Sequence, residues 1–160
     1  MEYRTEDQLS QEAMEQCLIK FTEILRRGTP GAFNSLISPG FIRCNFEENT
    51  MVYRYELEDW MKNPAGFLHG GIIASMLDTT MGSLSYYMTG GKITPTVTMK
   101  VDYVAGGLMG LPVYVGCKST RVTRNMGFIT CKAWQANEDK PFATADGVYY
   151  TGGKKQEFDL

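Results

Sequence analysis

Two features of the sequence could do chemistry: a glycine pair after the single histidine, and an aspartate in an apolar stretch. His69-Gly70-Gly71 stands directly before a long apolar segment with helical spacing. The first amides of a helix lack internal partners and lie at the positive end of its dipole. Because two glycines let a ligand approach the backbone, the segment suits an oxyanion or a polarised carbonyl oxygen. A tight loop that needs glycine only for its geometry is the alternative.

Asp78 is the second feature, and it lies within a largely apolar segment, flanked by Met76, Leu77 and Met81. Aspartate is a poor helix former and is seldom buried without a partner. A carboxylate in such surroundings is typical of a nucleophile or a general base. A solvated stripe of the helix, or a hydrogen bond to a neighbouring strand, would explain the same residue without catalysis.

Helix geometry restricts how these two features can cooperate. Asp78 follows Gly70 by eight residues, which is about 12 Å along a helix axis. A carbonyl under attack needs its oxygen near the amide and its carbon within about 3.5 Å of the attacking group. One helix cannot supply both to one carbonyl. If the two residues cooperate, they come from different subunits, and the sequence predicts an active site at the interface of an obligatory dimer.

The elements that must position these residues follow from hydrophobic periodicity. We expect helices at Thr5–Arg27 and Ile72–Met88, and strands at Phe41–Asn45, Met51–Leu57, Thr96–Tyr103, Val113–Val122, Gly127–Ala136 and Pro141–Tyr150. Ile73, Leu77, Met81 and Leu84 mark the buried face of the second helix. One long buried helix with antiparallel strands before and after it predicts an α+β fold in which a curved sheet wraps the helix.

Length and composition exclude several classes of protein. The 160 residues fit one domain, and the net charge of −2 gives no general case for binding nucleic acid. No apolar run approaches the roughly 20 residues of a membrane span, and no signal peptide is evident, so the expected location is the cytoplasm. The four cysteines form no CxxC pair and none is near His69, which argues against a metal site.

The spacing around these residues resembles a known family. Asn63-x-x-Gly66-x-x-His69-Gly70-Gly71, with Asp78 seven residues later and Gly82 four beyond it, is similar to the hotdog acyl-CoA thioesterases of the phenylacetic-acid-degradation (PaaI-like) type. The resemblance covers about residues 45–150. It implies a hotdog domain over residues 31–152, a helical extension over residues 1–30 and a polar tail over residues 153–160.

The resemblance also implies roles for individual residues. The Gly70 amide would polarise the thioester carbonyl, Asn63 would orient the substrate, and His69 would brace the loop. Asp78 of the partner subunit would attack or activate water, and Thr96 would supply a hydroxyl that holds water. The substrate would be an acyl-CoA, with no separate cofactor, and the protein would be a homodimer or a dimer of dimers.

Coenzyme A carries phosphates, which need a local basic site in a chain of this charge. Arg121 and Arg124 flank the junction of two late strands, and Asn125 and Gly127 lie in the same turn. We expect these residues, together with Gly71 beside the reacting carbonyl, to bind the substrate. Ordinary charges at a strand edge are the alternative interpretation.

Two other functions remain open on the same fold. A hydratase would pair its aspartate with a nearby histidine on the helix, whereas the only histidine here precedes Asp78 by nine residues. A non-catalytic acyl-CoA-binding protein would not require Asp78. A serine mechanism would need a GxSxG motif and a second role for His69, and no such motif is present.

Overall fold

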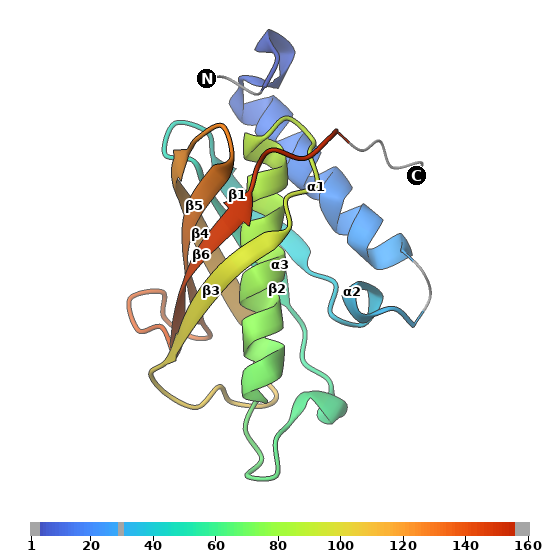
Figure 1. Cartoon of the computed structure of the whole chain (residues 1–160). Helices are drawn as coiled ribbons and strands as arrows, with labels where there is room; N and C mark the ends of the chain where they lie inside the picture. The colour runs from blue at the N-terminus through green and yellow to red at the C-terminus, as the bar shows by residue number, and fades with distance from the viewer. Residues whose placement is uncertain (1–3, 29–30, 156–160) are drawn as a thin grey trace.

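The computed structural model describes residues 4–28 and 31–155, and its centre is the long helix α3 (Gly70–Met88) inside a curved sheet (Figure 1). All strand pairs are antiparallel. In sheet order the six strands are β1 (Gly40–Asn45), β2 (Thr50–Tyr55), β4 (Val113–Val122), β5 (Met126–Trp134), β6 (Ala143–Tyr150) and β3 (Thr96–Tyr103). This is the expected α+β hotdog architecture, and the bounds of β3 and β4 match those expected from the sequence.

The core forms where α3 meets the concave face of the sheet. Ile73, Leu77, Met81 and Leu84 are at most 3% exposed, so the helix face expected from periodicity is confirmed. Hydroxyl groups on this helix bond its own carbonyls; Thr80, for example, donates to the carbonyl of Met76 at 2.8 Å. The helix begins at Gly70, two residues before the expected Ile72, because the side chain of His69 caps it.

The amino-terminal helix α1 (Gln11–Arg27) is shorter than expected from the sequence. Ser10 accepts a hydrogen bond from the amide of Ala13 and thereby starts α1, while residues 6–8 form a separate 3-10 turn, η1 (Glu6–Gln8). Two short helices, α2 (Phe33–Leu36) and η2 (Asp59–Met61), were not expected from the periodicity. Most of the expected polar tail, residues 156–160, lies outside the described residues.

The two edges of the sheet differ in how they are covered. At the β1 edge, the side chain of Gln11 in α1 donates to the carbonyl of Cys44 and accepts from the amide of Phe46. At the β3 edge, Val97 and Tyr103 are each 53% exposed. An uncovered edge strand is a template for pairing with another chain. The described part of the chain therefore leaves β3 open to a partner.

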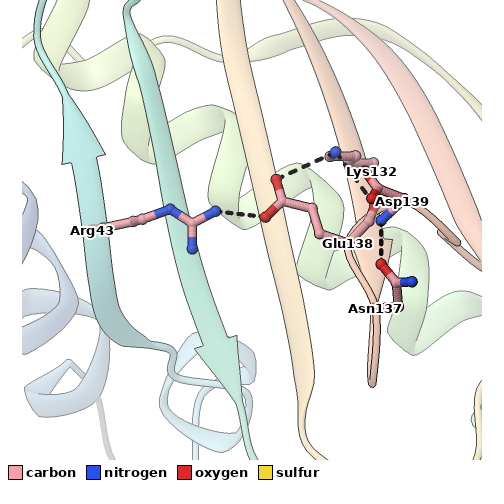
Figure 2. Close-up of polar contacts among 5 residues, drawn as sticks. All are labelled: Arg43, Lys132, Asn137, Glu138 and Asp139. Atoms are coloured by element: carbon pink, nitrogen blue, oxygen red, sulfur yellow. Dashed lines mark hydrogen bonds and ion pairs between the residues drawn. The ribbon is translucent and has the colours of Figure 1, made fainter.

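The outer face of the sheet carries a separate polar cluster (Figure 2). Glu138, in the loop after β5, accepts a 2.7 Å hydrogen bond from Arg43 of β1 and lies 3.3 Å from the ammonium of Lys132 of β5. Lys118 lies in the same cavity of about 560 Å³. Because all these side chains are partly exposed, the ion pairs contribute little stability.

No helix within residues 4–28 and 31–155 has the length and apolarity needed to cross a membrane.

Candidate active site

Asp78 accepts two short hydrogen bonds on one oxygen of its carboxylate. The hydroxyls of Thr96 and Tyr149 each donate to Oδ1 at 2.8 Å. Among the described residues, no side chain or amide bonds Oδ2. Two donors on one oxygen hold the orientation of the carboxylate. The second oxygen is therefore the one available to a substrate or a water molecule.

Tyr149 was not recognised in the sequence as a candidate residue. Strand alternation in β6 turns it inward, where it is 1% exposed, whereas Tyr150 is 42% exposed. Gly147 makes room for the ring, since a Cβ there would lie 2.9 Å from Tyr149. Burial, and then the negative charge of Asp78, raise the pKa of Tyr149. Its hydroxyl consequently stays protonated and acts as a donor to the carboxylate.

The glycine loop is held by side chains on either side of it. The Asn63 side-chain oxygen accepts from the amides of Ala65 and Phe67, at 2.9 and 3.1 Å. The His69 Nδ1 accepts from the amide of Gly71 at 2.9 Å. The Gly71 amide is thus already engaged, and the amide of Gly70 is the first of α3 and lacks an intrahelical partner.

Tyr103 stabilises the same helix start from the edge strand. Its hydroxyl donates to the carbonyl of Gly70 at 2.9 Å, and a Cβ on Gly70 would lie 3.5 Å from its ring. Thr96, at the other end of β3, contacts Asp78. The two ends of one exposed strand therefore touch the two candidate catalytic residues.

Gly70 and Asp78 do not converge within one chain. Helix α3 runs without interruption from Gly70 to Met88, so eight residues separate the two by about 12 Å along its axis. The amide and the carboxylate cannot meet on a single carbonyl of the same subunit. Gly70 and Asp78 are thus as far apart along one helix as the sequence argument assumed, and the interface site stays a prediction.

The expected CoA-binding residues lie at the opposite end of the molecule from Gly70. Arg121, Arg124 and Asn125 are exposed in or beside the β4–β5 hairpin, near the carboxyl end of α3 (Figure 1). A Cβ on Gly127 would lie 3.7 Å from the hydroxyl of Ser85 near the end of that helix. The basic hairpin therefore lies far from the glycine loop of its own chain, and its role in binding CoA stays a prediction.

A cavity of about 190 Å³ opens beside Asp78. It is lined by Phe21, Leu25, Asn34, Asp78, Thr79, Gly82, Tyr86, Lys92, Ile93, Thr94, Pro95, Thr96 and Tyr149. The cavity thus places the carboxylate and both of its donors against a largely apolar space. Within the described residues, no group of three or more His, Cys, Asp or Glu side chains is arranged to hold a metal ion.

Comparison with known proteins shows which class of protein the chain resembles. A family model described as "Thioesterase superfamily" matches residues 65–142. The Xenopus laevis acyl-coenzyme A thioesterase THEM4 is 33% identical over 96 residues, which cover 58% of this chain and 42% of that protein. The chain has the hotdog fold, its residues 65–142 are similar to the thioesterase superfamily, and it spans less than half the length of this curated relative.

Solved structures show the same fold at low sequence identity. Zebrafish thioesterase superfamily member 2 has a TM-score of 0.72 and 19% identity, covering 90% of this chain and 99% of that one. Escherichia coli PaaI, from the phenylacetic acid degradation operon, has a TM-score of 0.72 and 15% identity, covering 89% and 99%. A Streptococcus mutans protein bound to acetyl-CoA has a TM-score of 0.63 and 21% identity, covering 73% and 92%.

Proposed function

We propose that this protein hydrolyses acyl-CoA thioesters to a free acid and CoA, with Asp78 as the catalytic carboxylate. The observation that carries the proposal is the pair of hydroxyl donors on Oδ1 of a carboxylate that lines a largely apolar cavity. The similarity to a named acyl-CoA thioesterase and to a structure that holds acetyl-CoA supports the same substrate class.

The chemistry needs few groups because a thioester is electrophilic and a thiolate leaves readily. Oδ2 of Asp78 attacks the carbonyl carbon or takes a proton from a water that attacks it. The amide of Gly70 from a partner subunit stabilises the oxygen as negative charge develops there. The carbon–sulfur bond breaks, the thiolate of CoA takes a proton, and water supplies the oxygen of the released acid.

The open β3 edge supports a dimeric site. Antiparallel pairing of two β3 strands about a two-fold axis would bring the Tyr103 end of one strand to the Thr96 end of the other. Tyr103 contacts Gly70, and Thr96 contacts Asp78. Such pairing moves the glycine loop of one subunit toward the carboxylate of the other, as the distance along α3 requires. Arg121 and Arg124 would then contact CoA phosphates outside the cavity beside Asp78.

Asp78→Asn tests the assignment because it keeps the shape of the side chain and removes the charge. We expect turnover of acyl-CoA, followed by release of free thiol, to fall by about 100-fold or more, with the thermal midpoint and oligomeric state unchanged. Asp146→Asn, at an exposed carboxylate of β6, is the matched control. A variant that turns over as fast as the parent would exclude Asp78. A parent that binds acyl-CoA without releasing thiol would instead be a binding protein.

A further inference from the structure

The amino-terminal helix α1 forms one wall of the cavity that contains Asp78. Phe21 and Leu25 project from α1 into its lining, opposite residues of α3 and of the segment before β3. The sequence did not show whether this helix covers the pocket or an oligomer surface. Its place in the lining gives it a role in selecting substrates, an inference that rests on the proposed thioesterase function.

The cavity beside Asp78, called the acyl chamber below, runs along one face of α3. Asp78, Gly82 and Tyr86 all line it and are spaced four residues apart, so they share a helix face over about 12 Å. A Cβ on Gly82 would find its nearest neighbour, the ring of Tyr149, at 3.9 Å. The absence of a side chain at Gly82 therefore keeps the middle of the chamber open, between the carboxylate at one end and Tyr86 at the other.

Two aromatic rings close the far end. The ring centroids of Phe21 and Tyr86 are 4.6 Å apart with an interplanar angle of 34°. The Tyr86 hydroxyl approaches Gly91, where a Cβ would lie at 3.5 Å and the backbone φ is +94°. Gly91 thus lies behind the hydroxyl of Tyr86, while Phe21 is carried by α1 and packs on the Tyr86 ring.

Helix α1 is itself firmly attached to the core. Met14 and Leu18 of α1 are fully buried. The buried hydroxyl of Tyr53 donates to the carbonyl of Leu18 at 3.0 Å. The hydroxyl of Tyr87 in α3 donates to the carbonyl of Gln8 at 2.8 Å, just before α1 begins. The backbone that carries Phe21 is therefore held in place, as it must be if this side chain limits the length of the acyl group.

We propose that Phe21, packed on Tyr86, is the end wall of the acyl chamber and sets the largest acyl group that the enzyme accepts. The chamber holds about 190 Å³, and an apolar cavity of about 150 Å³ accommodates benzene. By proportion, the substrate class is acyl-CoA whose acyl part has about eight carbons or one aromatic ring. Longer chains meet the two rings before their carbonyl reaches Asp78.

The test compares kcat/KM over a series of straight-chain acyl-CoAs and one aryl-CoA. Phe21→Ala removes the wall, so chains too long for the parent gain about tenfold or more for each methylene newly admitted. Phe21→Leu gives a smaller gain in the same direction and keeps more of the packing of α1. Gly82→Ala narrows the chamber and lowers kcat/KM selectively for the bulkiest substrates, while the added alanine favours the helix.

Ile24→Ala is the matched control, since it also removes apolar packing from α1 but does not line the chamber. We expect its acyl-length profile to equal that of the parent. If the acyl-length profile of kcat/KM is unshifted in both Phe21 variants, or shifts equally in Ile24→Ala, the proposal that Phe21 is the end wall is wrong.

Binding measured without turnover separates this inference from the proposed function. The same acyl-CoAs are titrated by calorimetry into Asp78→Asn and into Asp78→Asn with Phe21→Ala. If the double variant prefers a longer acyl chain, the role of Phe21 as the end wall is supported, whether or not the parent releases thiol. A parent that releases no thiol would contradict only the hydrolase assignment. If no acyl-CoA binds either variant, the chamber is not an acyl site and the inference is wrong.

Discussion

The hydroxyl of Tyr149 lies 2.8 Å from Oδ1 of Asp78, although 71 residues separate the two in the chain. Burial and the adjacent carboxylate raise the pKa of this tyrosine, so it remains a donor. A buried neutral donor bonded to a carboxylate limits the rotation of that carboxylate. Tyr149 is thus a positioning residue for Asp78.

Tyr149→Phe keeps the ring and removes only the donor. Hydrogen bonds to charged groups contribute about 1.5–3 kcal/mol, so we expect kcat on acyl-CoA to fall by about 10- to 100-fold. KM should change little, because the hydroxyl is already engaged with Asp78. Steady-state kinetics separate the two parameters, and Tyr150→Phe, at the exposed neighbouring ring, is the control. A rise in KM at constant kcat would contradict the positioning role.

Thr96→Val tests the second donor to Asp78 with almost no change in shape. We expect a similar loss in kcat, of about 10- to 100-fold, whereas Thr96→Ser should retain most of the activity because it keeps the hydroxyl. Thr98→Val changes another exposed position of β3 and should leave kcat unchanged. Equal kinetics of the Val and Ser variants at position 96 would show that the hydroxyl has no part in turnover.

Mixing two inactive variants tests whether the site is shared between subunits. Asp78→Asn subunits keep Gly70, and Gly70→Val subunits keep Asp78, so each mixed dimer contains one intact pair and one doubly altered pair. After co-refolding at equal amounts, random pairing restores activity to about a quarter of the parent value.

Gly70→Val on its own should be inactive, because a branched side chain blocks the approach of the carbonyl to the first amide of α3. Light scattering establishes whether the mixed protein is a dimer or a larger assembly. Mixed dimers that remain as inactive as either variant would place both residues of the site in one subunit.

Burial raises the pKa of the Cys17 thiol to about 11, against an ordinary value of 9.0, with a smaller opposing effect of Lys20. The folded state therefore binds this proton more tightly than the unfolded chain does. The associated stability is fully present below pH 9 and is lost as the pH rises from 9 toward 11, by on the order of 2 kcal/mol.

Urea unfolding of the parent and of Cys17→Ala measures this loss as a difference. Both proteins share the contributions of the other buried groups, so only the Cys17 thiol separates their pH profiles. We expect the parent to lose more free energy of unfolding than the variant between pH 9 and 11. Parallel profiles would mean that the thiol titrates normally in the folded protein.

The central helix, the six strands and the class of fold could be predicted from the sequence alone, whereas the start of α1 and the short helices α2 and η2 could not. Apolar spacing at Ile73, Leu77 and Met81 defined the buried face of α3, and strict alternation predicted β3 to the residue. The motif from Asn63 to Asp78 indicated the hotdog thioesterases. Each of these signals is local, because helix and strand periods depend only on residues close in the chain. Ser10 and His69 shifted helix starts by side-chain caps, which periodicity does not report.

Only the tertiary structure decided which groups meet Asp78 and what bounds its cavity. Thr96 was a candidate from the sequence, but Tyr149 had no local signal, since its position depends on the pairing of β6 with β3 and on the space left by Gly147. Phe21 belonged to a helix whose role was open until α1 was seen against α3. Contacts between distant segments depend on register and packing, and these are properties of the assembled sheet and helices.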